Sequence, residues 1–220
     1  MGRPLGSKHP DHGRRREALL DAAMPRLVAD HGGTSFNELA AELDVSAPTL
    51  RHYFGDRAGL VAAALRRQAH HARPHLERAA VPSSPDLEAS LAHYLGELAA
   101  AWRMFGVGRL FAAGLTMGLA DGAAGPAYLD GVLEPTLAAV ESRLRRHAEA
   151  GALRCGPDDA DALRAAALAL LSPALLALLH QDALGGAMCR ALDVPAFMRT
   201  HVAAFVRGWG RPPRRPVKAV

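Results

Sequence analysis

Apolar residues recur at helical spacing along most of the chain. From Phe36 to Leu43 they fall at i, i+3, i+4 and i+7, the stripe of an amphipathic helix that packs on one face. Leu50 and Phe54 lie four residues apart, which predicts a second short helix directly after the first. No segment alternates with a period of two, and only 5% of the residues are aromatic. The pattern therefore predicts an all-α fold of about nine helices.

Residues around these two short helices are typical helix starts. Thr34 and Ser35 are good N-caps, and Glu38 stands three residues after Ser35, as in a capping box. Ser46 can cap the second helix. Pro48 fits its first turn, where a missing N–H costs little. Both helices are thus bounded by local signals.

The turn and the outward face indicate what this pair of helices does. Asp44 tolerates a left-handed backbone, and Val45 can fill the space between the helices. The residues that face outward are short or can be positively charged: Ala47, Pro48, Thr49, Arg51 and His52. Short residues let the backbone approach the floor of a DNA major groove, and Arg51 can reach a guanine or a phosphate. We predict a helix-turn-helix; the alternative is an ordinary helical hairpin with a solvated face.

The run TSFNELAAELDVSAPTLRHYF, followed by Gly55, Asp56, Arg57 and Leu60, resembles the DNA-binding domain of TetR-family transcriptional repressors. The resemblance extends from Leu19 to about Leu65. It implies an N-terminal three-helix DNA-binding domain and a C-terminal helical domain for ligand binding and dimerisation. It also implies that Ala47, Pro48, Thr49, Arg51 and His52 lie at the major groove, and that phosphates are held by Thr34, Ser35, Tyr53 and Arg57.

Four positions depart from the family pattern. Arg51 stands where an aromatic residue is usual, and Asp44 replaces the turn glycine. Arg57 replaces the usual lysine; its planar guanidinium keeps the charge but does not make an equivalent phosphate contact. Pro25 interrupts the apolar stripe of the first helix, so we expect a kink or a bulge there. The loop containing Gly32 and Gly33 is also shorter than is usual for the family.

Charge is divided unevenly along the chain. Residues 1–73 carry 11 Lys/Arg and 8 Asp/Glu, residues 74–206 carry 10 and 14, and residues 207–220 carry 5 and 0. We expect residues 1–16 to form a basic arm whose Arg14, Arg15 and Arg16 contact phosphates or the minor groove; a solvated tail is the alternative. The composition of residues 210–220 predicts a basic, proline-rich, solubilising tail.

Breaks in the pattern suggest two domains between these ends. Residues 17–73 would form the helix-turn-helix domain with its linking helix, which we expect to end near His70. Pro74 and the segment 81–85 predict breaks. Residues 84–209 would form the ligand-binding and dimerisation domain.

Two helices of the second domain suggest a subunit interface. Residues 162–179 are almost all Ala or Leu, so this helix is apolar around more than one face. The last helix offers a second apolar set: Phe197, Met198, Val202, Phe205 and Val206. Together they resemble the helices that pair in TetR-like homodimers, which read two half-sites. The alternatives are the core helix of a monomer and, less favoured because of Pro173 and the short apolar length, a membrane span.

The effector site is the least determined part of the sequence. The large or polar residues available to line a cavity are His93, Tyr94, Trp102, Met104, Phe105, Phe111, Met117 and His180. Each is also a candidate for ordinary core packing. Their chemistry predicts an apolar or aromatic small-molecule effector held by one or two hydrogen bonds.

Other chemistry finds little support in the sequence. His70, His71 and His75 do not share one helix face, and Cys155 and Cys189 form no CxxC motif, so we expect reduced thiols and no metal or cofactor. No catalytic motif is present, and no signal peptide. We predict a cytoplasmic regulator, not an enzyme, that binds an operator and is released by an effector. The alternatives are a non-specific architectural DNA-binding protein and a small-molecule-binding helical protein without DNA function.

Overall fold

The computed structural model describes residues 10–29, 34–104, 107–120 and 124–212 of the 220. Within these ranges the chain forms eleven α-helices and two short π-helical segments. Nine of the α-helices have seven residues or more. Extended pairing in the described residues is limited to an isolated bridge between Leu153 and Gly210. The all-α prediction is confirmed.

The helices gather into two units, each made of two stretches of chain. Unit 1 comprises Met1–His71 and Arg109–Val132, and unit 2 comprises Ala72–Gly108 and Leu133–Val220. The predicted basic tail lies outside the described residues beyond position 212, as do residues 1–9 and the pair Gly32 and Gly33.

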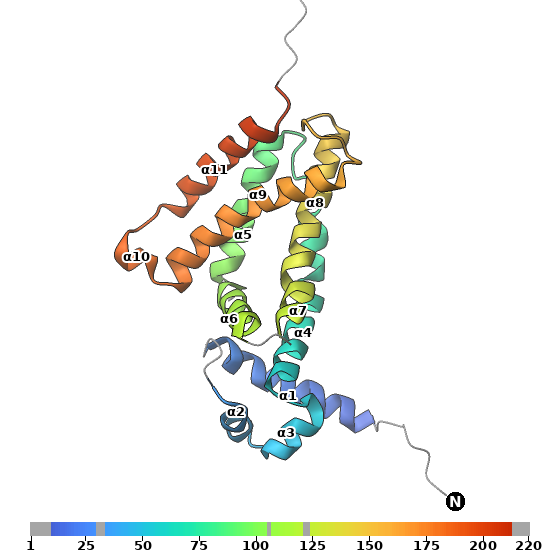
Figure 1. Ribbon diagram of the computed structural model, residues 1–220, viewed down its shortest axis with the longest axis vertical. Helices are drawn as coiled ribbons and strands as arrows, with labels where there is room; N and C mark the ends of the chain where they lie inside the picture. The colour runs from blue at the N-terminus through green and yellow to red at the C-terminus, as the bar shows by residue number, and fades with distance from the viewer. Residues whose placement is uncertain (1–9, 30–33, 105–106, 121–123, 213–220) are drawn as a thin grey trace, which may run out of the picture. The chain divides into compact units, whose positions relative to one another are not determined.

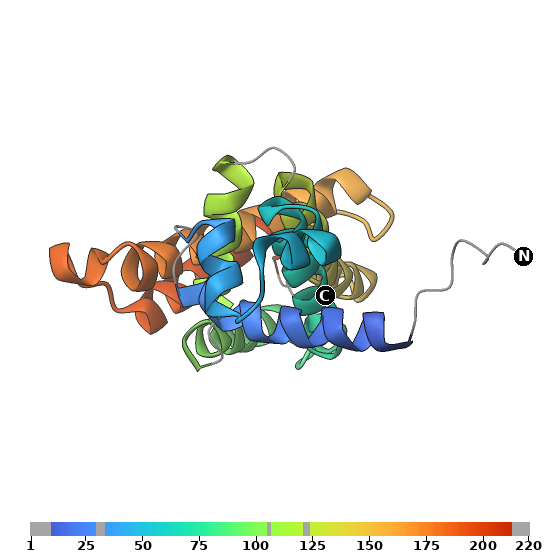
Figure 2. The same cartoon turned by 90° about the horizontal axis from the view of Figure 1, so that it is seen from below.

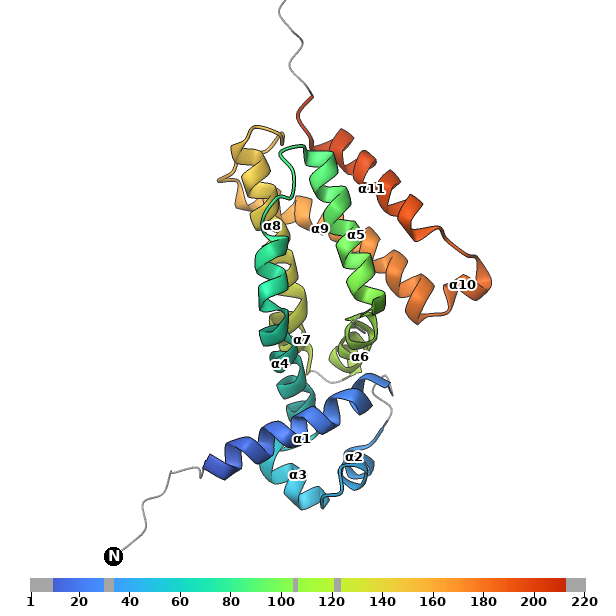
Figure 3. The same ribbon diagram turned by 180° about the vertical axis from the view of Figure 1, so that it is seen from behind.

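Unit 1 begins with a three-helix arrangement (Figure 3). Its helices are α1 (Pro10–Ala29), α2 (Phe36–Glu42) and α3 (Ala47–Phe54), followed by α4 (Arg57–Ala79). Figure 2 shows α1 in dark blue along its length. The buried side chains come from all four helices: Leu19, Leu20, Ala23, Leu27, Leu39, Leu50, Phe54, Leu60 and Leu65. Burial of these stripes stabilises helices that are too short to persist alone.

Local signals position α2 and α3 as the sequence predicts. Ser35 accepts a hydrogen bond from the Glu38 backbone N–H at 3.2 Å, and the Glu38 carboxylate accepts one from the Ser35 N–H at 2.8 Å. Ser46 caps α3 by accepting from the Thr49 N–H at 3.2 Å. Asp44 has a φ of 53° and is the non-glycine residue with left-handed backbone among those described. The capping box, the second cap and the turn are therefore confirmed.

Two prolines lie inside helices. α1 continues through Pro25 to Ala29, and its apolar stripe is buried on both sides of the proline. α4 continues through Pro74 to Ala79, so the expected end near His70 and break at Pro74 are wrong. A proline keeps φ in the helical range and removes one hydrogen bond, a loss that a long helix anchored elsewhere by burial can absorb.

Ion pairs join α1 to α4 and to α2. Arg67 of α4 pairs with both Glu17 and Asp21 of α1, and Arg26 pairs with Glu42 at 2.8 Å. These contacts hold the first helix against α4 and α2. All are partly exposed, so each contributes little stability by itself.

The second stretch of unit 1 contains most of α6 (Val107–Ala120), α7 (Ala124–Tyr128) and most of the π-helical η1 (Leu129–Leu133). Glycines bring these elements close to α4 and to each other. A Cβ at Gly114 would lie 2.6 Å from the Tyr128 ring and 3.3 Å from Leu65. A Cβ at Gly131 would lie 3.3 Å from the Leu65 carbonyl oxygen. Gly114 therefore lies close to both Tyr128 and Leu65, and Gly131 lies against α4.

Unit 2 is a helical bundle (Figure 1). Its main helices are α5 (Leu87–Met104), α8 (Glu134–Glu149), α9 (Ala160–Leu178) and α11 (Val194–Trp209), with η2 (Leu179–Ala183) and the short α10 (Gly186–Cys189) between the last two. α9 packs against α8, α11 and α5, and α11 also packs against α5. One face of α9 is therefore core. Its outer face leaves Leu168 and Leu176 exposed.

Backbone hydrogen bonds close one end of the bundle. The Arg154 N–H donates to the Trp209 carbonyl at 2.9 Å, and the Arg211 N–H donates to the Ala152 carbonyl at 2.8 Å. These bonds tie the end of α11 to the loop after α8. Trp209 and Trp102, the two tryptophans of the chain, both belong to unit 2.

Candidate nucleic-acid interface and ligand-binding residues

α3 presents an outward surface on a buried base. Leu50 and Phe54 are 0% and 8% exposed, and they anchor the helix to unit 1. The predicted groove-facing residues Pro48, Arg51 and His52 are exposed, while Ala47 and Thr49 are half-buried. The Thr49 hydroxyl is 2.8 Å from that of Ser46, so it also takes part in the cap. The structure brings all five predicted residues together on one short helix.

Arg51 is exposed but has a neighbour within its own domain. Its guanidinium carbon lies 6.0 Å from the centre of the Phe36 ring. This contact places the guanidinium on the α2 side of α3. The departure from the usual aromatic residue therefore places a partly positioned cation on the surface.

The predicted phosphate-binding residues lie at the start of α2, at the end of α3 and at the start of α4. Arg57 donates from Nε to the Thr34 carbonyl at 2.9 Å, which joins α4 to the segment preceding α2. Ser35 is exposed at the α2 N-terminus, where backbone N–H groups favour an anion. Tyr53 is half-buried. Arg57 therefore has a structural contact in addition to the phosphate contact that we predict.

The residues predicted as part of a basic arm lie within α1, because that helix begins at Pro10. Arg14 and Arg15 are exposed, whereas the Arg16 guanidinium carbon lies 5.1 Å from the centre of the Phe54 ring. Arg14, Arg15 and Arg16 therefore sit on a fixed helix, and Arg16 contacts the base of the recognition helix.

His12 belongs to the same surface, although the sequence did not single it out. Its ring centre is 4.7 Å from that of Tyr53 and 5.3 Å from that of His52. The first turns of α1 therefore flank the second half of α3. The signal available in the sequence was an aromatic side chain one turn before Arg16, but no local pattern linked it to α3.

The residues predicted to bind a ligand fall into both units. Phe111 and Met117 belong to unit 1, where the Phe111 ring centre is 5.7 Å from that of Tyr128. Unit 2 contains His93, Tyr94, Trp102, Met104 and His180, while Phe105 lies outside the described residues. Within unit 2, Tyr94 and Trp102 are buried, and His93 and His180 are exposed.

The surroundings of the unit 2 residues favour structural roles for several of them. The Arg143 guanidinium carbon lies 5.3 Å from the centre of the Tyr94 ring, and burial raises the pKa of the Tyr94 hydroxyl. Trp102 is packed so closely against Gly108 that a Cβ there would lie 2.3 Å from the indole nitrogen. His93 pairs with Glu97 on the surface at 3.4 Å.

Tyr128 is a buried polar residue that the sequence prediction missed. It is 3% exposed, and its hydroxyl has no hydrogen-bond partner among the described residues. Burial raises the pKa of this phenol, so the hydroxyl stays protonated and able to donate. A buried donor without a partner costs about 1–3 kcal/mol, which marks Tyr128 as a candidate for contacting a ligand.

Arg143 is a second residue that the sequence prediction missed. It is 1% exposed, and it donates to the Ala79 carbonyl at 2.7 Å and to the Ser90 hydroxyl at 2.7 Å. It thus joins the end of α4, α5 and α8. Arg143 and His147 both lie on the apolar stripe of α8 with Val140 and Leu144, and a polar residue on such a stripe was the available signal.

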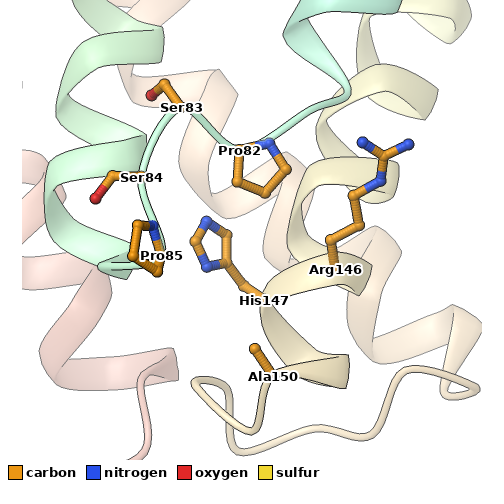
Figure 4. Close-up of a pocket in the computed structure, with 7 residues that line it drawn as sticks. All are labelled: Pro82, Ser83, Ser84, Pro85, Arg146, His147 and Ala150. Carbon is orange, nitrogen blue, oxygen red and sulfur yellow. The ribbon is translucent and has the colours of Figure 1, made fainter.

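A small pocket lies beside His147 in unit 2 (Figure 4). Its volume is about 230 Å³, and it is lined by the segment 82–85, Arg146, His147 and Ala150. The His147 ring projects from α8 toward the segment 82–85. None of these residues was predicted to bind a ligand.

Comparison with known protein families supports a helix-turn-helix in the first part of the chain. Residues 19–64 match the family model of the bacterial regulatory proteins, tetR family. No curated protein sequence matches the chain.

Solved structures share the fold over most of this chain. A protein described as a TetR-family transcriptional regulator from Mesorhizobium loti MAFF303099 has a TM-score of 0.67 at 18% identity, over 93% of this chain and 100% of that one. A transcriptional regulator from Saccharomonospora viridis in complex with choline has a TM-score of 0.66 at 18% identity, over 91% and 100%. SmeT, the repressor of the Stenotrophomonas maltophilia multidrug efflux pump SmeDEF, has a TM-score of 0.57 at 20% identity, over 90% and 91%.

The capped pair of short helices with an exposed cationic face thus defines a helix-turn-helix DNA-binding protein. Residues 19–64 match the family model of the bacterial regulatory proteins, tetR family, and the chain shares the fold of solved TetR-family transcriptional regulators.

Proposed function

We propose that this chain is a one-component repressor, a homodimer that occupies an operator through two copies of α3 and leaves it when a small molecule binds. The observation that carries the proposal is the exposed, cationic outer face of α3 on a buried base of Leu50 and Phe54. The repressor role has support from SmeT, whose fold this chain shares. In this role the chain acts by binding rather than by catalysis, in the cytoplasm.

The proposed operator contacts are of two kinds, to base edges and to phosphates. The exposed end of α3, with Ala47, Pro48, Thr49, Arg51 and His52, reads base edges in the major groove. The α2 N-terminus with Thr34 and Ser35, together with Tyr53 and Arg57, contacts phosphates. Arg14, Arg15 and Arg16 add phosphate contacts from α1 and increase the salt dependence of binding.

Exposed apolar residues on the outer side of unit 2 support a dimer. Leu176 is 64% exposed on α9, and Leu184 and Met188, which follow it, are 70% and 92% exposed. A single protomer leaves these side chains in water. A second copy packed by twofold symmetry on α9 and α11 buries them, and it sets two recognition helices at the spacing of two half-sites.

The effector of this proposal is an apolar or aromatic small molecule with a hydrogen-bond acceptor. Phe111, Met117 and the unpartnered Tyr128 hydroxyl lie in the second stretch of unit 1, in which Gly114 is close to both the Tyr128 ring and Leu65 of α4. A ligand that separates or repacks these groups acts on α4. The difference between its affinities for the operator-binding and the released conformation limits how far it shifts the equilibrium between them.

The test is fluorescence anisotropy with the DNA beside the gene for this chain and a scrambled duplex of equal length, at near-physiological salt. We expect binding to the native duplex to be tighter by a factor of about 10³ or more. Arg51→Ala should weaken native-duplex binding by roughly tenfold to a hundredfold and reduce the preference over scrambled DNA.

Arg190→Ala is the matched control, because it removes the same charge from an exposed position of unit 2. It should leave the affinity within about twofold. Equal binding to both duplexes would indicate the architectural alternative. No binding to any DNA would indicate a helical protein that binds small molecules only.

A further inference from the structure

We propose that the pocket between the segment 82–85 and the last turn of α8 binds a small organic carboxylate. This site is separate from the residues proposed above for the effector, and it lies wholly within unit 2. The inference rests on four features: a buried unpartnered nitrogen, local positive charge, apolar walls and a guanidinium at the rim.

The buried nitrogen belongs to His147. Its side chain is 2% exposed, and Nε2 has no hydrogen-bond partner among the described residues. In Figure 4 the ring points toward the residues that form the opposite wall of the pocket. Leaving such a group unpaired costs about 1–3 kcal/mol, so a ligand oxygen that reaches it removes a penalty that the free protein carries.

The local charge favours an anion. Burial and the nearby Arg143 lower the pKa of His147, so at neutral pH the ring is neutral and one of its nitrogens carries a hydrogen that can be donated. Arg143 lies one turn before His147 on α8, and Arg146 lies at the rim. The opposing carboxylate is Asp86, which accepts a hydrogen bond from the Ala89 N–H at 2.8 Å. Arg143 and Arg146 thus face Asp86, which this bond partly neutralises, and Glu97, whose charge acts on Arg143.

The walls define the rest of the ligand. Pro82 and Pro85 form one side, and Ala150 lies on the other beside the imidazole (Figure 4). A volume of 230 Å³ is below the roughly 300–1,000 Å³ of sites for drug-sized molecules, so the ligand has few heavy atoms. In Figure 4 the Arg146 guanidinium points away from His147, so this exposed side chain must turn toward the pocket before its planar fork can match a carboxylate in two parallel hydrogen bonds. The proline faces suit a flat apolar body.

The experiment is titration of the purified full-length protein with sodium benzoate at pH 7.5, followed by isothermal calorimetry and by the side-chain nitrogen shifts of His147. We expect saturable binding and a shift of the His147 signals. Benzamide, which has the same shape without the charge, should bind at least about tenfold more weakly. Saturable binding of inorganic phosphate without binding of benzoate would overturn the proposal, because it would define a site for inorganic anions.

Variants separate the pocket from the general charge of α8. Arg146→Ala should weaken benzoate binding at least about tenfold, and Arg146→Lys should fall between this variant and the wild type. Arg145→Ala is the matched control: this neighbouring arginine donates to the Pro157 carbonyl at 3.2 Å and does not line the pocket. It should leave benzoate affinity within about twofold.

Two results would overturn the proposal. One is equal loss in Arg145→Ala and Arg146→Ala, which would mean that benzoate responds to the net charge of the surface. The other is the absence of saturation by wild-type protein together with unshifted His147 signals. Either result leaves the DNA-binding proposal untouched, since operator affinity is measured without benzoate.

Discussion

The helix-turn-helix of unit 1 and the helical bundle of unit 2 are specified over different distances along the chain. In the first, the cap bonds of Ser35 with Glu38 and of Ser46 with Thr49 join residues three apart. In the second, Arg143 reaches Ser90 across 53 residues and Arg103 reaches Asp182 across 79. The DNA-reading part is therefore built from local signals, and the bundle from contacts that only the folded chain creates.

Among the substitutions that test this contrast, Arg143→Ala should change the free energy of unfolding most. The substitution leaves the Ala79 carbonyl and the Ser90 hydroxyl without their donor and removes a buried side chain. It should lower the free energy of unfolding of unit 2 by about 3 kcal/mol. Urea denaturation followed by circular dichroism measures the change, with Arg145→Ala as a control expected within about 0.5 kcal/mol. A loss below about 1 kcal/mol would show that the contacts of Arg143 are dispensable.

A pH-dependent effect is expected from His147. Burial, followed by the charge of Arg143, lowers the pKa of His147 in the folded chain below the ordinary value of about 6.5. As the pH falls below about 6.5, the unfolded chain binds a proton that the folded chain does not, so stability falls until the folded pKa is passed. The slope reaches at most about 1.4 kcal/mol per pH unit.

His147→Gln should remove this part of the acid sensitivity. Denaturation at a series of pH values from 7.5 to 5 compares it with wild type and with His70→Gln, an exposed histidine of α4. Parallel curves for wild type and His147→Gln would contradict the assignment.

A smaller effect is expected within the helix-turn-helix from Ser46→Ala. The variant removes the acceptor of the Thr49 N–H at the start of α3, so it should lower stability by about 1 kcal/mol. Thermal unfolding measures the loss, and Ser46→Asp should restore it because aspartate also caps. Equal stability of Ser46→Ala and wild type would mean that the cap is not needed.

The smallest effect is expected at the turn. Asp44 has a φ of 53°, a conformation that glycine adopts freely. Asp44→Gly should therefore change stability by no more than about 0.5 kcal/mol, whereas Asp44→Ala should lower it by about 1 kcal/mol. The same thermal measurement ranks the two, and a greater loss for glycine than for alanine would contradict the role of the backbone conformation.

The contrast between the two regions also explains how much the sequence could predict. The caps of α2 and α3, the turn at Asp44 and the inward Leu50 and Phe54 were all readable, because each depends on residues within one turn of each other. The prediction of a break at Pro74 failed because α4 is held before the proline by the buried Leu60 to Leu65 and after it by the bond from Arg143 to the Ala79 carbonyl, and neither is a local property.

The remaining misses have the same cause. Tyr128, Arg143 and His147 become notable only through what surrounds them: a hydroxyl without a partner, a cation bonded to distant backbone and an imidazole facing another loop. His12 joins the recognition surface through contacts with Tyr53 and His52, some 40 residues away. Periodicity predicts which residues are buried, but it does not predict which distant group they meet.

The position of Trp102 and Trp209 has a practical consequence. Because both indoles lie in unit 2, the intrinsic tryptophan emission of the protein reports on the bundle and gives no signal from the DNA-reading helices. A tryptophan introduced in place of Phe36 would supply the missing optical signal. Stopped-flow traces of the wild type would then time the response of unit 2, and the difference between the variant and the wild type would time that of unit 1.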